Sequence, residues 1–292
     1  NDATLAVVND VITVTLTSDE AIKTGADPTV TVNSNTATVA RNSAVSFTAT
    51  YTMSSPADDA IDGSSIPINI SSYTDATGNA GATVTATTDG SAVTYDNTVP
   101  TLGTATIASD NTYDHLAKEE DVITLTIASS ENINSPTVSM LGSTADVTVT
   151  QGADARNWTA TKEVEGGHSD GTVAFNIAFT DLAGNNGAAV TSLTGGDDAV
   201  TVDKQKPTIT TASIASNNAS GDELAVPGNV ITLTIVSNED IVEPTVTIAT
   251  QSATVSIGAD AQNWSATYTM TENESNGTIP FTIDYADSAG NE

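Results

Sequence analysis

The sequence contains no cysteine, few aromatic residues and very few basic side chains. Without cysteine there is no disulfide framework, no thiolate metal site and no cysteine nucleophile. Only 7 Lys and Arg residues stand against 37 Asp and Glu, and the formal net charge of -30 repels phosphate backbones, which excludes nucleic acid as a partner. The two histidines, His115 and His168, have no obvious catalytic partner, so we expect no enzymatic activity.

Long hydrophobic runs are also absent. No apolar stretch approaches the roughly 20 residues that a membrane-spanning helix needs, so we expect no membrane insertion in this segment. No signal-peptide pattern opens the chain, as expected of a mature or excerpted segment. The negative charge favours solubility, and its self-repulsion must be partly offset by cations, which fits a salty, calcium-containing exterior.

What the chain does contain is repetition, because five sequence blocks recur three times in the same order. A strand-like V-I-T-V/L-T block begins at Val11, Val122 and Val230. An acidic block, a P-T-V block, a block with one large aromatic residue and a D-x-x-G-N block follow it each time. The acids of the second and fifth blocks are Glu20, Glu131 and Glu239, and Asp75, Asp181 and Asp287. The sequence therefore predicts a tandem array of one domain.

The blocks divide the chain into residues 1–97, 98–204 and 205–292, here called units 1, 2 and 3. Units 2 and 3 open with similar Thr/Ala/Ile-rich segments, at residues 101–114 and 208–222, which unit 1 does not have. Unit 3 has no counterpart of the tail that closes unit 1. We therefore expect the first unit to lack its opening strand and the last its closing strand. A fragment of a longer array explains this, and the alternative is strand exchange between neighbouring chains.

Within each unit, apolar residues alternate with threonine. Ile12, Val14 and Leu16 show this period of two in unit 1, and the corresponding blocks of units 2 and 3 repeat it. The pattern is typical of a β-strand with one buried and one wetted face, and threonine is a good strand former on the wetted face. About seven such strands per unit, separated by Gly, Asp, Asn and Pro turns, predict an all-β fold of two-sheet antiparallel sandwiches.

One large aromatic residue occupies the same place in each unit: Phe47, Trp158 and Trp264. Because the alternation points these rings inward, we interpret them as core residues rather than as a ligand-stacking platform. Pro67 and Pro280 conflict with the strand-like segments around them, since proline cannot donate a ladder hydrogen bond. Either the strand starts after the proline or the proline lies at a bulge, and the sequence leaves both open.

These blocks together resemble the tandem bacterial immunoglobulin-like repeats of giant cell-surface proteins, including adhesins and surface-layer proteins. The resemblance is carried by the V-I-T-L-T strand, the S-E-N and N-E-D acids, the W-x-A-T-Y-T-M strand, D-x-A-G-N, and the linkers D-N-T-V-P-T and D-K-Q-K-P-T. It implies three tandem immunoglobulin-like β-sandwiches at a cell surface, with further copies of the repeat in a longer chain as partners. It also implies spacers that are often stiffened by calcium at their joints.

In the usual strand order of such a sandwich, the acidic block, the D-x-x-G-N block and the incoming linker lie at one end of a unit. Two sets of oxygen-bearing side chains are therefore expected to converge at the joints between units. They are Asp96, Glu131, Asp181 and Asn185 at the first joint, and Asp203, Glu239, Asp287 and Asn291 at the second. Oxygen ligands without His or Cys suit Ca²⁺, and neighbouring carboxylates repel one another unless a cation is bound. We predict calcium at both joints; the alternative is solvated acidic loops.

Asp96, the acid of the first linker, reaches the joint only if the preceding segment continues toward unit 2. Residues 81–96 are too long for one strand, and Asp89-Gly90 could fold them back as a hairpin. A kink would carry Asp96 to the next unit, and we favour it because a linker must continue the array. Five further acids are expected at the far end of their units, where they could complete the ligand shell: Asp58, Asp59, Asp62, Glu165 and Asp170.

The expected function is mechanical, as a calcium-stiffened extracellular spacer of a large microbial surface adhesin. One alternative is a self-assembling surface-layer or filament subunit that uses lateral contacts or strand exchange with neighbouring identical chains. A second alternative, a glycan-binding module, needs an exposed aromatic platform, and both tryptophans occupy apparent core positions.

Overall fold

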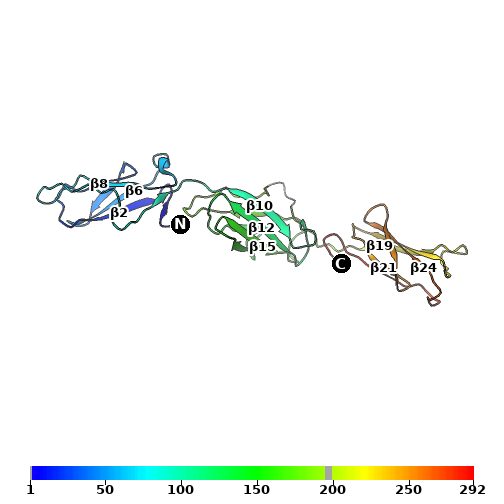
Figure 1. The fold of residues 1–292 in the computed structure, drawn as a ribbon. Helices are drawn as coiled ribbons and strands as arrows, with labels where there is room; N and C mark the ends of the chain where they lie inside the picture. Colours follow the sequence, from blue (N-terminus) through cyan, green and yellow to red (C-terminus); the bar gives the residue numbers. More distant parts are fainter. Residues whose placement is uncertain (1, 195–198) are drawn as a thin grey trace.

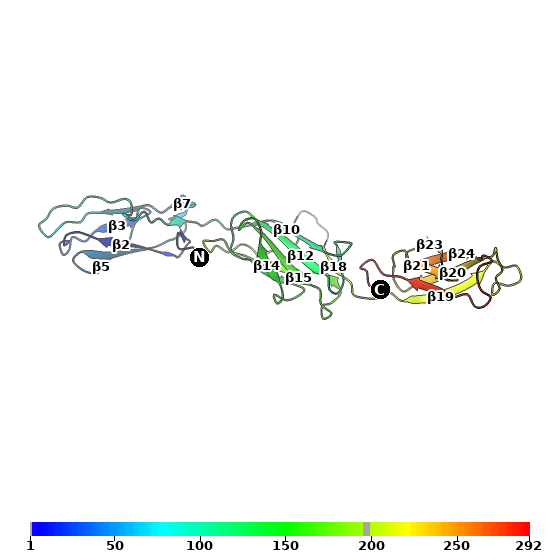
Figure 2. The same ribbon diagram turned by 60° about the horizontal axis from the view of Figure 1, so that its bottom comes forward.

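The computed structural model describes residues 2–194 and 199–292. They form three β-sandwiches that lie end to end, as both views show, with each chain terminus close to a joint between sandwiches (Figures 1 and 2). The described ranges contain no α-helix and a single turn of 3₁₀-helix, η1 (Asp59–Ile61). No helix in these ranges has the length and apolar character of a membrane span.

Unit 2 shows the complete arrangement of strands. Its strands are β10 (Leu102–Ser109), β11 (Leu116–Ala117), β12 (Val122–Ser129), β13 (Thr137–Met140), β14 (Thr148–Gln151), β15 (Asn157–Glu163), β16 (Gly171–Thr172), β17 (Phe175–Ala178) and β18 (Thr201–Val202). One antiparallel sheet has the order β10-β12-β15-β14, and the other pairs β13 with β17, which is bridged to Val190. This is the A-B-E-D and C-F-G order of the immunoglobulin constant-type sandwich.

Unit 1 repeats this order without a counterpart of β10. Its strands are β1 (Leu5–Ala6), β2 (Val11–Thr17), β3 (Thr29–Val32), β4 (Asn35–Thr36), β5 (Thr38–Arg41), β6 (Ser46–Thr52), β7 (Ser64–Ser65), β8 (Ile68–Ser71) and β9 (Thr94–Tyr95). The sheet orders are β2-β6-β5, β4-β3-β8 and β1-β9-β7. The opening strand is therefore missing from the described part of unit 1, as expected, and β2 forms the edge of its sheet.

Unit 3 keeps the opening strand and has no counterpart of β18 among the residues that the structure describes. Its strands are β19 (Ile209–Ser216), β20 (Val230–Ser237), β21 (Thr245–Ile248), β22 (Gln251–Ser252), β23 (Thr254–Ile257), β24 (Asn263–Thr269) and β25 (Phe281–Asp284). The sheet orders are β19-β20-β24-β23 and β22-β21-β25. The predicted fold class of three tandem immunoglobulin-like sandwiches is confirmed, together with both missing end strands.

The core of each unit lies between its two sheets. On β12, Ile123, Leu125 and Ile127 are all fully buried, while the intervening threonines face outward. The large aromatic residues belong to these cores, since Trp158 and Trp264 are only 7% and 8% exposed. Each indole Nε1 donates to a backbone carbonyl three residues earlier, so burying the ring leaves no polar atom unpaired. The prediction of core aromatics is confirmed.

The two prolines that conflicted with strand patterns lie just before strands rather than within them. β8 begins at Ile68 and β25 at Phe281, each directly after its proline. The carbonyl oxygens of Pro67 and Pro280 accept backbone hydrogen bonds at 2.8 Å, so proline contributes its acceptor where it has no donor to offer. Of the two possibilities that the sequence left open, the late start is correct.

The tail that closes unit 1 runs in one direction toward unit 2. Val84 pairs with Ile70, and Thr94 pairs with Ser65, which lies earlier on the facing segment. Because later tail residues pair with earlier partners, the tail advances antiparallel to that segment, with an irregular stretch around Gly90 at φ 77°. The kink is therefore confirmed over the hairpin, and Asp96 is delivered to the joint.

We expect Leu125→Ala to lower the free energy of unfolding of unit 2 by about 2–5 kcal/mol, because it opens a cavity in a fully buried site. Calorimetry of the whole chain should show one unfolding step shifting while the others stay in place. The matched control is Thr126→Ala on the exposed face of the same strand, expected within about 0.5 kcal/mol of the parent. Equal effects of the two substitutions would contradict the assigned inward and outward faces.

Candidate metal centres at the two joints

The D-x-x-G-N loops are folded around their own aspartate. The Oδ1 atom of Asp181 accepts the backbone N–H of Gly184 at 2.6 Å and of Asn185 at 2.8 Å, and its Oδ2 accepts the Asn185 side-chain amide at 2.8 Å. Gly184 has φ 111°, a conformation that glycine adopts without strain. Asp287 is held in the same way by Asn291. The loop therefore fixes each carboxylate before any ligand arrives.

At the first joint the predicted residues come together. Asp96, Glu131 and Asp181 each offer a carboxylate oxygen within 4.8 Å of the other two, and Asp181 is only 1% exposed. Asn185 Nδ2 donates to the Asp96 carbonyl oxygen at 3.0 Å, which ties the loop of unit 2 to the linker. We call this three-carboxylate set the first triad.

The second joint repeats the arrangement. Asp203, Glu239 and Asp287 meet the same 4.8 Å limit and form the second triad, in which Asp287 is buried. Asn291 Nδ2 donates to the Asp203 carbonyl oxygen at 3.0 Å. The geometry thus brings together all eight residues that the sequence proposed, and each triad combines one linker carboxylate with two from the following unit.

The triads are clusters of like charge, and no ion pair among the described residues includes a triad carboxylate. Burial raises the pKa of Asp96, and the charges of Asp181 and Asp62 raise it further. Burial likewise raises the pKa of Glu131 and of Glu239, with added contributions from the other two carboxylates of each triad. In the part of the chain that the structure describes, the ion pairs join Arg41 to Asp27 and His115 to Asp114, and neither involves a triad.

Unit 1 provides an internal comparison, because Glu20 and Asp75 occupy the same two slots without a linker carboxylate beside them. Glu20 is exposed and Asp75 is half-buried, and neither belongs to a cluster of three ligating groups in the described ranges. Hydrogen bonds from Asn79 and Thr77 lower the pKa of Asp75 well below its ordinary value. The D-x-x-G-N loop alone therefore stabilises its aspartate as an anion. In units 2 and 3 the linker carboxylate adds a further negative charge, which contributes to the raised pKa of the neighbouring glutamate.

The far-end acids hold the linkers rather than joining the triads. Asp62 accepts the Asn97 backbone N–H at 2.6 Å and the Thr98 hydroxyl at 2.8 Å. Asp170 likewise accepts the Lys204 backbone N–H at 3.1 Å and the Gln205 side-chain amide at 3.0 Å. Asp62 and Asp170 lie outside the triads and hold the linkers, while the expectation that far-end acids complete the ligand shell stays a prediction.

Asp58 does not face the joint either, because it is buried inside unit 1. Burial pushes its pKa up, but hydrogen bonds from Asn33, Ser54 and Tyr51 outweigh this and leave the pKa lowered. Neither Asp59 nor Glu165 belongs to a triad. Asp59 instead accepts the Asn97 side-chain amide at 3.1 Å.

Three joint contacts escaped the sequence analysis. Asp2 N donates to the Leu182 carbonyl oxygen at 3.1 Å, and Asn111 Nδ2 to the Ala289 carbonyl oxygen at 2.9 Å, so both D-x-x-G-N loops touch the preceding unit directly. Lys204 Nζ also donates to two backbone carbonyl oxygens of unit 2. The only sequence signal for that lysine contact was the difference between the linkers D-N-T-V-P-T and D-K-Q-K-P-T.

No family model and no curated protein matches the chain. Among solved structures it is similar to the titin I9–I11 tandem, at 7% identity and TM-score 0.35, over 97% of this chain and 92% of that one. A marsupial T cell receptor gives 10% identity and TM-score 0.38 over 96% of each chain. The mouse nectin-like molecule 4 ectodomain (Ig1–Ig3) gives 12% identity and a TM-score of 0.31, over 98% of this chain and 93% of that one. At these scores the likeness adds no weight, and the immunoglobulin-like assignment stands on strand order.

We expect Glu131→Gln to stabilise the cation-free protein at pH 7 by about 0.5 kcal/mol, measured by thermal unfolding in EDTA. A raised pKa in the folded state means that stability is lost as the pH rises and the carboxyl ionises, and Gln removes this loss. The gain should vanish below the ordinary pKa of glutamate, about 4.3. Glu20→Gln, in the same slot of unit 1, should leave stability unchanged. An equal gain there would contradict the claim that repulsion within the first triad lowers stability.

Proposed function

We propose that this chain is an extracellular spacer array whose joints are stiffened by Ca²⁺, as part of a large microbial surface adhesin. The observation that supports this most directly is the repetition of a three-carboxylate cluster at both joints. A cluster that recurs at equivalent joints, and is built across the joint each time, favours a structural role over catalysis.

The chemistry of the triads favours a hard cation. Every candidate ligand is an oxygen, and Ca²⁺ binds 6–8 oxygens at about 2.3–2.6 Å. Two oxygens on opposite sides of one Ca²⁺ are then about 4.6–5.2 Å apart, so carboxylate oxygens within 4.8 Å of one another are close enough to share a single ion. A divalent ion would also offset the mutual repulsion that raises the pKa of Glu131 and Glu239.

The mechanical effect follows from where the ligands come from. Asp96 belongs to the linker that leaves unit 1, while Glu131 and Asp181 belong to loops of unit 2. Asp62 holds the next linker residues from the unit 1 side. An ion bound by the first triad would therefore fix the linker to unit 2 while unit 1 holds its other flank, and the two sandwiches would turn as one body. In the absence of an ion, repulsion would favour an outward displacement of the linker acid.

The length of the array is the second feature that suits a spacer. The three sandwiches lie in a row, so each added unit lengthens the array rather than thickening it (Figure 1). The extracellular setting is supported by the high negative charge and by the resemblance of the repeat blocks, and calcium is plentiful there. The partners proposed are further copies of the repeat within a longer chain. Both tryptophan rings are buried in cores, which gives the glycan-binding alternative no support.

Relative to EDTA, millimolar Ca²⁺ should raise the melting temperature of the array. It should also increase the maximum dimension derived from small-angle X-ray scattering, because the joints become fixed. Titration calorimetry should give two sites per chain. In the double variant Glu131→Gln with Glu239→Gln the calcium-induced changes should largely disappear. Glu20→Gln should respond like the parent. Scattering profiles that superimpose with EDTA and with calcium would refute the stiffening role.

A further inference from the structure

The two joints carry equivalent triads but different linkers. The linker of the first joint reads D-N-T-V-P-T, and that of the second reads D-K-Q-K-P-T. Lys204 and Lys206 thus stand where the first linker has Asn97 and Val99. The first linker contains one acid and no base, whereas the second contains one acid and two lysines. The joints therefore differ in their basic side chains rather than in their candidate ligands.

The two linker lysines bond to the units on either side of the second joint. Lys204 Nζ donates to the carbonyl oxygens of Gly166, at 2.8 Å, and of His168, both in unit 2. Lys206 Nζ donates to the carbonyl oxygen of Glu292 in unit 3, at 2.8 Å. An ammonium group has three donors, so each lysine can hold a backbone segment by more than one bond. The second linker is thus tied to both of its sandwiches by positively charged groups.

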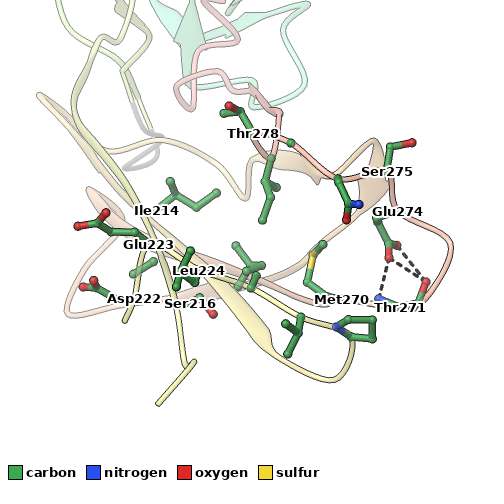
Figure 3. Close-up of a pocket in the computed structure, with 18 of the residues that line it drawn as sticks. Ile214, Ser216, Asp222, Glu223, Leu224, Met270, Thr271, Glu274, Ser275 and Thr278 are labelled. Carbon is green, nitrogen blue, oxygen red and sulfur yellow. Dashed lines mark hydrogen bonds between the residues drawn. The ribbon is translucent and has the colours of Figure 1, made fainter. Parts of the chain in front are cut away.

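The loop that receives Lys204 is closed by its own hydrogen bonds. Glu165 N–H donates to His168 Nδ1 at 2.9 Å, and His168 N–H donates to the Glu165 carbonyl oxygen at 3.0 Å. The equivalent loop of unit 3 is closed in the same way, since a Glu274 carboxylate oxygen accepts the Thr271 N–H at 2.7 Å (Figure 3). Because the loop is shaped without help from the linker, its carbonyl oxygens are a fixed point of attachment for Lys204.

A third lysine crosses the second joint directly. Lys118 belongs to unit 2, and a Cβ built on Gly290 of unit 3 would be 3.4 Å from Lys118 Cε, so this side chain lies against the D-x-x-G-N loop. The same position in unit 1 is Val7, which has no charge. Lys118 and Lys206 therefore place positive charge beside the loop that carries Asp287, a member of the second triad.

The first joint has further negative charge in place of these lysines. Beyond burial and the charges of the triad itself, Asp62 raises the pKa of Asp96 and of Glu131 further. Arg156 lies at the same end of unit 2, but its Nε donates to the Ser129 carbonyl oxygen at 3.4 Å, within its own unit. The first joint therefore combines repulsion with neutral residues at the three positions where the second joint has lysine.

We propose that the three lysines do at the second joint what a bound cation does at the first. The second joint then stays fixed without Ca²⁺, and the first joint is the calcium-dependent hinge. This inference rests on the proposed function for the role of Ca²⁺ at the first joint. When calcium is withdrawn, the array bends at one defined place, between units 1 and 2, instead of loosening at both joints.

The test measures the mobility of each joint separately in the whole chain. Because the sequence has no cysteine, spin labels can be attached at chosen pairs of introduced cysteines. Thr15, Thr126 and Thr234 are exposed and occupy the same position on β2, β12 and β20. Thr15→Cys with Thr126→Cys reports on the first joint, and Thr126→Cys with Thr234→Cys reports on the second.

Double electron–electron resonance gives the distribution of distances for each pair of labels. In EDTA the distribution should be roughly twice as broad across the first joint as across the second, because a hinge samples many orientations. Millimolar Ca²⁺ should narrow the first distribution and leave the second nearly unchanged.

Exchanging residues between the joints should exchange this behaviour. One variant gives the second joint the residues of the first: Lys118→Val, Lys204→Asn and Lys206→Val. The reverse variant gives the first joint the lysines of the second: Val7→Lys, Asn97→Lys and Val99→Lys. In EDTA the former should broaden the second distribution about twofold, and the latter should narrow the first by a similar factor. The matched control is Arg156→Gln, which introduces the residue of unit 3 and should change neither distribution.

Equal widths at the two joints in EDTA, or exchange variants that keep the widths of the parent, would overturn this inference. Calcium that narrows neither distribution would instead refute the stiffening proposed for Ca²⁺, and with it the calcium response of the first joint. The widths in EDTA would in that case still decide whether the lysines fix the second joint, because that comparison involves no calcium.

Discussion

Repulsion between three carboxylates at each joint is the main electrostatic constraint on how neighbouring units are joined. The fold brings Asp96, Glu131 and Asp181 together in spite of their like charges, and the raised pKa values of Asp96 and Glu131 reflect this crowding together with their burial. The sandwiches themselves do not need these groups, because their cores close without them. The cost falls on the relative position of neighbouring units, so we expect the joint to be the part of the molecule most sensitive to ions.

The structure keeps the clusters in place by fixing their members separately. The D-x-x-G-N loop fixes its aspartate by hydrogen bonds within the loop, and Asn185 and Asn291 tie the loop to the incoming linker. The preceding unit holds the other side of the linker through Asp62 or Asp170. Acidic side chains thus serve two purposes at a joint: some accept hydrogen bonds from the linker, and others face one another in a triad.

The same fold explains why the two outer units are unlike the middle one. In this sandwich the closing strand completes the core as well as an edge, so unit 3 exposes Ile214 where unit 2 buries Ile107. Unit 1 differs at the opposite place, where β2 has no strand beside it and Val11 is exposed. The middle unit carries both strands, so it is the reference for the strand order of the described parts of the other two.

The repeated blocks and the period-two alternation were enough to predict the sandwiches, the inward direction of Phe47, Trp158 and Trp264, and the two missing strands. They were enough because alternation is a local property of a half-buried strand, and because three copies reveal which segment is absent from one. The eight joint residues were also predictable, once the strand order placed their loops at one end. Calcium at the joints stays a prediction.

Only the tertiary structure decided the rest, since it depended on contacts between segments far apart in the chain. The start of β8 after Pro67 and the one-way path of the tail past Gly90 depend on partners that no local pattern identifies. Asp58 and Asp62 also have different roles because each role is set by contacts with distant segments. Four residues apart and chemically identical, one is buried among donors of its own unit, and the other reaches across to hold the linker. Charge and spacing are written in the sequence, whereas the donor that meets each carboxylate is set by packing.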